Sequence, residues 1–425
     1  MGKFTLTAKR DWITSYEILQ SESTNPDYAG KHVQFPRRLD FTCAFTQADF
    51  KLLVISFFYF GHRGHSIADF GAASGYECAT TSSVRTTEPV YHHRTGATTA
   101  SSNHACLQDE WFLMDWIEFR AMNTDVLMAA QGSLSKDGMQ IARDTIEAGE
   151  RRFSRFQQES ELSQLNRTAG QWFNASQETM DVLQKARYFF DVTKGLFDPS
   201  VLPDLIRAGY DRSMDEIRAQ DGVVSSAASD RKPKADFREM ELDLNSSRVR
   251  LPKDMQLDFG GIAKGWIVDQ AVTLLSRYSD ACAINAGGDM RFIGRSPIGL
   301  GWPVELEDPR DPSQSVARLT VNHGAVATSS VAKRTWKQGE KSRHHLIDPR
   351  TGEPVQSDWL CTTVIADDAV TAEVYAKALL IGGPAEVEKL TAHNNIVYLV
   401  VDREGALHGS PNSQEYVNEH EYIHQ

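Results

Sequence analysis

A short glycine-containing motif near the middle of the chain combines the residue types needed to bind phosphate. Residues 257–265 read L-D-F-G-G-I-A-K-G, which predicts a strand, a glycine pair and a helix start. Paired glycines let the backbone approach a ligand, and a helix start presents free N–H groups and a positive dipole end. Lys264 adds a positive charge and Asp258 a carboxylate. Because G-G-x-x-K is short, a plain strand-to-helix turn with a surface lysine remains the alternative.

Two adjacent histidines could supply proton transfer. His344 and His345 precede Asp348-Pro349-Arg350-Thr351-Gly352, which has the composition of a tight turn. In an extended segment, neighbouring side chains point to opposite faces, so we expect one histidine to face a site and the other to be solvated. An exposed pair is the simpler alternative. A histidine near neutrality can accept the proton of an attacking hydroxyl.

Other motifs are weaker when taken singly. The segment 285–289 (N-A-G-G-D) predicts a tight turn with a solvated Asp289, or a backbone wall against a flat ligand. Glu373 and Lys377 are four residues apart in an expected helix, a spacing typical of a solvated ion pair. The segments 160–166 (S-E-L-S-Q-L-N) and 196–200 (L-F-D-P-S) are two further candidate motifs.

These motifs depend on a framework of helices and strands. Apolar periodicity predicts helices over 136–156, 178–193, 262–278 and 369–381. Strands are expected over 117–122, 125–128, 281–286 and 290–293, with a hairpin formed by 239–244 and 248–251 and a surface loop over 221–236. Helices and strands mix without regular alternation, so the fold class is α+β.

Composition excludes several classes of protein. The 425 residues carry 45 Lys and Arg against 57 Asp and Glu, giving −12, which argues against a broad nucleic-acid-binding face. Five cysteines without a C-x-x-C pair argue against a disulfide scaffold and a thiolate zinc site. The longest apolar run, 52–60, is shorter than the roughly 18 residues of a membrane span. With no signal peptide over 1–12, we expect a cytoplasmic protein with no membrane span.

The chain divides near residue 113. Residues 1–113 hold three of the five cysteines and lack sustained periodicity, so we leave them unassigned. We expect either an extended segment or a stretch upstream of a true start at Met114, and the intact mass of the native protein distinguishes the two. Scattered histidines there do not predict a metal site. We expect a single catalytic domain over 114–410 and a tail over 411–425.

Taken in order, the motifs resemble the ApbE family of FAD:protein FMN transferases. The resemblance runs from about residue 114 to about residue 409, and G-G-I-A-K-G and H-x-I-D-P-R-T-G are its most specific parts. It implies that the chain moves FMN from FAD to a Thr or Ser hydroxyl of a target flavoprotein, releasing AMP. Some members hydrolyse FAD to FMN and AMP. A FAD pyrophosphatase and a non-catalytic FAD-binding protein are therefore the alternatives, and a generic phosphate-ligand enzyme is the interpretation without the family.

The resemblance also implies roles for individual residues. His345 would act at the reacting phosphate as a base or orienting group, with Asp258 beside the ligand. The other residues implied in FAD binding are Met122, Phe156, Asn166, Leu196, Phe197, Asp198, Lys264, Gly288, Asp289, Ser329 and Leu346. A divalent metal, usually Mg²⁺, would be held by the backbone carbonyl of Gly261 and by the late helix at Glu373 and Lys377.

The chain departs from the family at two places. The family's M-G-T reads Met122-Asn123-Thr124, a mild change. In the late helix, the usual Asp and Thr ligands are replaced by Glu373 and Lys377, and a protonated lysine has no lone pair for a metal. We therefore expect the Lys377 ammonium to take the metal's place at the pyrophosphate and the metal dependence to be weakened.

Overall fold

The fold is described from a computed structural model. It describes residues 114–224, 231, 233, 235–296, 301–392 and 396–418. These residues belong to one compact unit that begins at Trp111. The interpretation of residues 1–113 as an extended or upstream segment falls outside the described residues.

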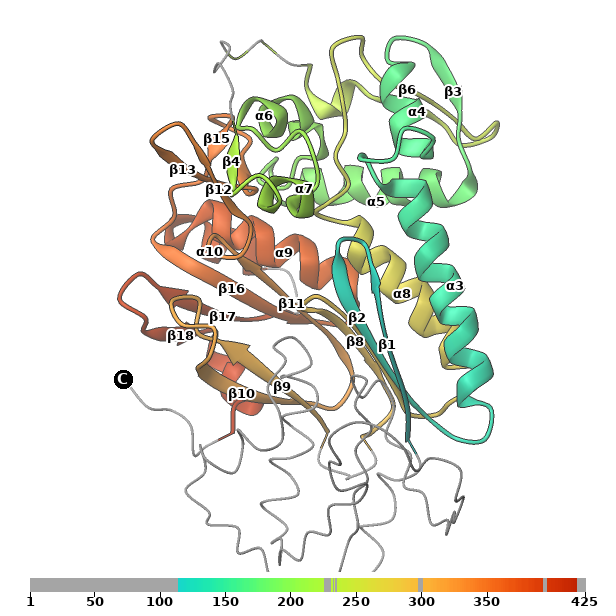
Figure 1. The fold of residues 1–425 in the computed structure, drawn as a ribbon, viewed down its shortest axis with the longest axis vertical. Helices are drawn as coiled ribbons and strands as arrows, with labels where there is room; N and C mark the ends of the chain where they lie inside the picture. Colours follow the sequence, from blue (N-terminus) through green and yellow to red (C-terminus); the bar gives the residue numbers. More distant parts are fainter. Residues whose placement is uncertain are drawn as a thin grey trace, which may run out of the picture. The chain divides into compact units, whose positions relative to one another are not determined.

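An eight-stranded antiparallel sheet forms the centre of the unit (Figure 1). Its spatial order, β1-β2-β7-β8-β11-β16-β17-β18, is also the order of these strands along the chain, and each neighbouring pair is antiparallel. The sheet is thus a meander whose connections carry the remaining elements. The strands are β1 (Met114–Ala121), β2 (Thr124–Gln131), β7 (Cys282–Ala286), β8 (Asp289–Ile293), β11 (Gly324–Ser330), β16 (Trp359–Ala366), β17 (Val397–Asp402) and β18 (Leu407–Gly409).

Three helices pack against this sheet. Helix α3 (Ser135–Phe153) contacts β1 and β2, α8 (Ala263–Leu275) contacts β7 and β8, and α9 (Ala369–Gly382) runs along β11 and β16. Helix α9 is buried along nearly its whole length and apolar on most faces, as expected for a helix enclosed on several sides. Polar residues on its enclosed surface therefore need partners.

The helices differ in which groups cap their first N–H groups, and this difference affects the site. Ser176 caps α5 (Gln177–Val192) by accepting from the Thr179 N–H, and Asp368 caps α9 by accepting from the Thr371 N–H. Helix α8 has no side-chain cap at Ile262. One of its free N–H groups, that of Gly265, instead donates to the carboxylate of Glu373 at 2.8 Å. The glycine turn is thereby tied to helix α9.

The connections between sheet strands hold the smaller elements. Those between β2 and α8 are α4 (Glu161–Arg167), β3 (Trp172–Asn174), α5, η3 (Pro199–Val201), α6 (Leu202–Arg207), α7 (Met214–Arg218), β4 (Val223–Val224), η4 (Phe237–Glu239), β5 (Glu241–Asp243) and β6 (Arg248–Arg250). The later ones are β9 (Trp302–Glu307), β10 (Ser315–Val321), β12 (Thr335–Gln338), β13 (Lys341–His344), β14 (Ile347–Asp348), β15 (Glu353–Pro354), η5 (Pro384–Glu386) and α10 (Val387–Thr391). The 3₁₀ turn η6 (Pro411–Glu415) follows the last strand, β18.

The α+β class is confirmed, and so are the four predicted helices and the 239–251 hairpin, with ends that differ by up to three residues. Three expectations need correction. The strand expected directly before the glycine pair is not formed, because the N–H and carbonyl of Leu257 bond the Asn166 side chain instead of a neighbouring strand. Val223 and Val224 form a strand with β12 rather than part of a surface loop. The expected tail packs on β10 through residue 418: the Thr320 N–H donates to Tyr416 O at 2.8 Å, and Val417 is buried.

None of the helices in the described part of the chain combines the length and the apolar character that a membrane span requires.

Candidate active site

A cavity opens where the glycine turn, the β1–β2 turn, the loop after β13 and helix α9 meet. It encloses about 1100 Å³, including space open to solvent. A smaller cavity of about 470 Å³ adjoins it, and the two share Gly260, Lys264, Arg334, His345 and Lys377. The shared residues come from three segments far apart in the sequence. A ligand that spans both cavities would therefore pass beside the cationic side chains of Lys264, Arg334 and Lys377.

Most of the predicted site residues line one or both cavities. Those lining the larger one are Met122, Phe156, Leu196, Phe197, Asp198, Asp258, Gly261, Lys264, His345, Leu346 and Lys377. Asp289, Ser329 and Glu373 line the smaller one. Among the described residues, Asn166 and Gly288 are the predicted positions that line neither cavity.

Asp258 fixes the shape of the glycine turn. One carboxylate oxygen accepts the Gly260 N–H at 2.7 Å, and the other lies 2.6 Å from Nε of Arg155. The Arg155 guanidinium in turn lies over the rings of Phe156 and Tyr210, with 4.1 Å and 4.6 Å to the centroids. Sequence reasoning missed Arg155, although it directly precedes a predicted site residue.

Asn166 stabilises the same turn through hydrogen bonds to the backbone of Leu257. Its amide donates to Leu257 O at 2.9 Å and accepts from Leu257 N at 2.8 Å, and the side chain is buried. Asn166 thus holds the irregular segment that leads into the glycine turn. Its contact with the ligand remains a prediction.

Gly287 and Gly288 form the two-residue turn between β7 and β8, both with positive φ, as the tight-turn interpretation predicts. The expected solvation of the next residue is wrong: Asp289 is 3 % exposed and pairs with Lys264. Gly287 lines the smaller cavity, so the turn also forms part of its wall. The corresponding hairpin turn, Met122-Asn123, likewise adopts positive φ.

Lys264 lies between two buried carboxylates. Its Nζ contacts Asp289 and lies 3.2 Å from Oε1 of Glu373. Burial lowers the pKa of Lys264 to about 8, against the opposing effect of Glu373. The interpretation of Glu373 and Lys377 as a solvated ion pair is wrong, because Glu373 is 3 % exposed and is engaged by Lys264 and Gly265.

His345 lies at the junction of the two cavities. Its Nδ1 is buried and has no hydrogen-bond partner in the described part of the chain. Burial, together with the charges of Arg334 and Lys377, holds the pKa of His345 well below its usual value, so the imidazole is neutral at pH 7. The expected solvation of its neighbour is wrong: His344 is partly buried, with Nε2 3.0 Å from Val355 O.

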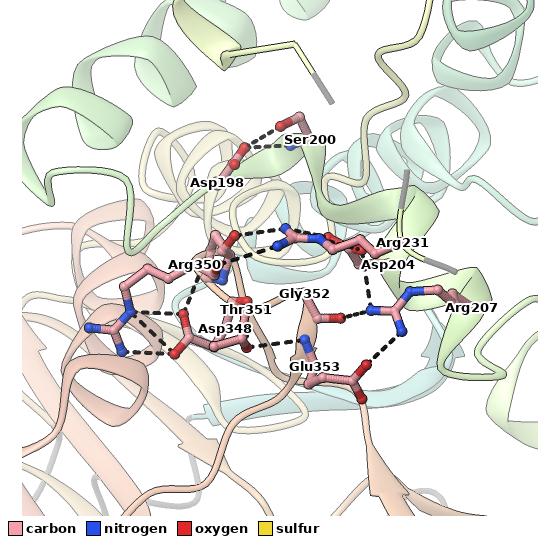
Figure 2. Close-up of polar contacts among 11 residues, drawn as sticks. Asp198, Ser200, Asp204, Arg207, Arg231, Asp348, Arg350, Thr351, Gly352 and Glu353 are labelled. Carbon is pink, nitrogen blue, oxygen red and sulfur yellow. Dashed lines mark hydrogen bonds and ion pairs between the residues drawn. The ribbon is translucent and has the colours of Figure 1, made fainter. Parts of the chain in front are cut away.

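A polar network holds the loop after His345 in place (Figure 2). Asp348 accepts from the backbone N–H of Arg350 and Gly352 closes the turn to Asp348 O at 2.7 Å, as the motif predicts. Arg207 and Arg231 then join this turn to buried Asp204: Arg231 donates to Asp204 at 3.0 Å and to Pro349 O at 2.9 Å. The loop is therefore anchored on helix α6.

Asp198 starts the 3₁₀ turn η3 and lines the larger cavity. Its Oδ1 accepts from the N–H and the hydroxyl of Ser200 at 2.8 Å and 2.6 Å (Figure 2). This cap fixes the orientation of the carboxylate.

The positions implied in metal binding do not fit a divalent ion. The Lys377 Nζ lies 3.4 Å from Gly260 O and so close to Gly261 that a Cβ there would collide with it. Mg²⁺ needs several oxygen ligands in octahedral geometry, whereas here an ammonium occupies the space beside the backbone carbonyls. Within the described ranges, no group of three or more His, Cys, Asp or Glu side chains could hold a metal.

Arg334 is a second cation that sequence reasoning missed. It precedes β12, lines both cavities and has no ion pair or side-chain hydrogen bond within the described residues. Burial is the largest cause of the lowered pKa values of Lys264, His345 and Lys377, and the charge of Arg334 lowers each of them further, which places it near all three. No motif marked it, because β12 and β13 were not predicted.

Known proteins share this sequence pattern and fold. The chain is 26% identical to an FAD:protein FMN transferase of Vibrio cholerae over 252 residues, 58% of this chain and 74% of that protein. It is 23% identical to one of Escherichia coli over 273 residues, 61% and 75% of the two chains. The structure is similar to the ApbE protein of Thermotoga maritima with a TM-score of 0.63 and 23% identity, over 72% of this chain and all of that one. The ApbE flavin transferase of Vibrio cholerae gives 0.58 and 21%, over 71% and 99%.

The model of the ApbE family matches residues 122–400, which include the glycine turn, the histidine pair and helix α9. The match begins at the β1–β2 turn and ends within β17, so it covers the elements that form both cavities. This chain belongs to the ApbE family.

Proposed function

We propose that this protein transfers the FMN part of FAD to a Thr or Ser hydroxyl of a target flavoprotein and releases AMP. Its relatives carry the name FAD:protein FMN transferase. The single observation that supports this most directly is a neutral His345 with an unpartnered buried nitrogen, placed between two cavities beside Lys264, Arg334 and Lys377.

In the reaction, the acceptor hydroxyl oxygen attacks the phosphorus on the FMN side of the pyrophosphate. The new P–O bond forms as the bond to the AMP phosphate breaks, and AMP leaves with the electron pair. His345 accepts the hydroxyl proton. The cationic side chains stabilise the charge that develops on the phosphate oxygens. Asp258 and Asn166 keep the glycine turn in the conformation that places Lys264 beside those oxygens.

The proposal is tested with the full chain, FAD and an acceptor protein carrying an exposed threonine. AMP release is followed by chromatography and the acceptor by intact mass. We expect AMP and an FMN adduct in equal amounts. AMP and free FMN without an adduct would indicate a FAD pyrophosphatase, and bound FAD without AMP a non-catalytic binder.

Replacing the base gives a second check. His345→Gln should lower the transfer rate by about 10²–10⁴-fold, the usual contribution of general base catalysis, while FAD still binds. His408→Gln is the matched control, because His408 is exposed on the edge strand β18 and pairs with Asp402 of β17. Equal rates for the two variants would contradict the role of His345.

A further inference from the structure

The inference concerns the positive charge at the reacting phosphate and rests on the proposed function. We propose that Lys377 and Arg334 together supply the charge that a divalent cation would supply, so that FMN transfer proceeds without a bound metal ion. Two single charges fixed to the chain replace one double charge. A divalent cation would need carboxylates in the site that are not already paired.

The carboxylates near the glycine turn are already engaged. Glu373 accepts the Gly265 N–H at 2.8 Å through one oxygen and lies 3.2 Å from Lys264 through the other. Asp289 pairs with the same ammonium. Both oxygens of Asp258 are engaged, by Arg155 and by the Gly260 N–H. A divalent ion would have to displace these buried contacts.

Lys377 occupies the space beside the turn. Its Nζ contacts the carbonyl of Gly260 and lies against Gly261, and the side chain lines both cavities. An additional Mg²⁺ at this carbonyl would lie within a few ångströms of an ammonium, and the two positive charges would repel each other strongly in a partly dry site. The same ammonium can instead donate to a phosphate oxygen.

Arg334 provides the second charge. Lys264 is balanced by Asp289 and Glu373, whereas the Arg334 guanidinium has no partner among the described residues. Its fork of N–H donors suits the oxygens of a phosphate. The cations left to neutralise a bound pyrophosphate are therefore Arg334 and Lys377, one from the loop before β12 and one from α9.

The first experiment compares the full-length protein in EDTA and in millimolar MgCl₂, with AMP release and adduct mass as readouts. We expect the two rates to agree within about threefold, because no metal takes part in stabilising the phosphate charge. A rate that disappears in EDTA and returns with Mg²⁺ would overturn the proposal.

The second experiment removes each charge. Lys377→Met and Arg334→Met should each lower the transfer rate about 10²–10³-fold, with no recovery on adding Mg²⁺. Lys389→Met is the matched control, since Lys389 is exposed on α10, away from both cavities, and pairs with Glu386. Full activity in Lys377→Met would contradict the proposal.

The third experiment does not depend on turnover. Lys377→Thr replaces the ammonium with an oxygen donor, so this variant should bind Mn²⁺ together with FAD, seen as loss of the free-ion EPR signal, whereas the native protein should not. FAD affinity, read from flavin fluorescence, should fall in Lys377→Met. Stoichiometric Mn²⁺ binding by the native protein would overturn the cation proposal. Absence of AMP under every condition would instead reject the proposed function and leave these binding results decisive.

Discussion

The residues around His345 show how an imidazole can stay neutral among positive charges. Burial and three nearby cations all disfavour the imidazolium, whereas Lys264 keeps its proton at neutral pH with the help of two carboxylates. The site therefore holds a neutral imidazole and a protonated lysine over the same pH range, which are the charge states that the proposed transfer requires. His344, fixed by Val355 and Leu346, orients the segment from which His345 projects.

We predict a pH profile of kcat/KM with widely separated limbs, since this quantity reports groups of the free enzyme. As pH falls, His345 stays neutral until well below 6.5, so the acidic limb lies below that value. As pH rises through about 8, Lys264 loses its proton and the site loses a positive charge, so kcat/KM declines. AMP release measured from pH 5 to 10 checks both limbs, and an acidic midpoint at or above 6.5 would contradict the assignment.

At this scale, the sequence could identify residues within recognisable motifs but not those that act across the chain. His345 and Lys264 belong to motifs whose spacing indicates chemistry. Arg155 engages Asp258 from a position more than a hundred residues earlier, and Arg334 precedes an unpredicted strand. Nothing local marks such contacts, because they exist only once distant segments fold together. The family resemblance identified Asn166 as a candidate, but its two hydrogen bonds to the backbone of Leu257 are visible only in the structure.

Helices α3, α8 and α9 determine the relative positions of the turn and the carboxylate of Glu373. Two glycines set the helix spacing. A Cβ at Gly265 would lie 2.5 Å from the backbone oxygen of Ala369, at the start of α9. A Cβ at Gly149 in α3 would instead meet the side chain of Ile267 in α8, at 2.6 Å. Backbone at a helix crossing yields less readily than a side chain.

Alanine at these two glycines should therefore have different effects. Gly265→Ala should lower the free energy of unfolding by about 2–3 kcal/mol, because α9 must shift. Gly149→Ala should lower it by about 1–2 kcal/mol, because the buried Ile267 side chain must shift, while better helix propensity recovers part of the loss. Urea unfolding measures both, and AMP release should fall in Gly265→Ala alone, because Glu373 moves with α9. Equal losses of stability would contradict this account.

Element prediction succeeded where periodicity was strong. The amphipathic helices α3 and α5 were found within a few residues. Strands β9 to β13, β16 and β17 were not predicted from the sequence. Strand β16 is buried on both faces, so its sequence W-L-C-T-T-V-I-A lacks the alternation by which a half-buried strand is recognised. The sheet order could not be inferred either, since it depends on pairings between strands separated by long insertions.

For the whole molecule, we propose that the catalytic unit ends later than the motifs suggest. Every residue that lines either cavity lies between 122 and 381, and the compact unit begins at Trp111. The residues after Ser410 nevertheless contribute structure, because Ser413 and Val417 are buried and Asn418 donates to Arg318 O. Removing residues from the two ends of the chain should therefore have different effects on stability and on the rate of AMP release.

Two truncations test this prediction. A chain that begins at Trp111 should keep its rate of AMP release within about twofold, because a domain with its own core folds alone. A chain that ends at Ser410 should lose the apolar contacts of Val417 and melt roughly 3–5 °C lower. Calorimetry and AMP release on both proteins check these outcomes. A large loss of activity on removing residues 1–110 would show that this segment contributes to the site.

The order of strands in the central sheet has a consequence for newly synthesised chains. Because the strands pair in the order in which they leave the ribosome, the sheet can extend from one edge while translation continues. Helix α9, with Glu373 and Lys377, emerges among the last elements. A nascent chain therefore can form most of its sheet before the residues that α9 adds to the site have been synthesised.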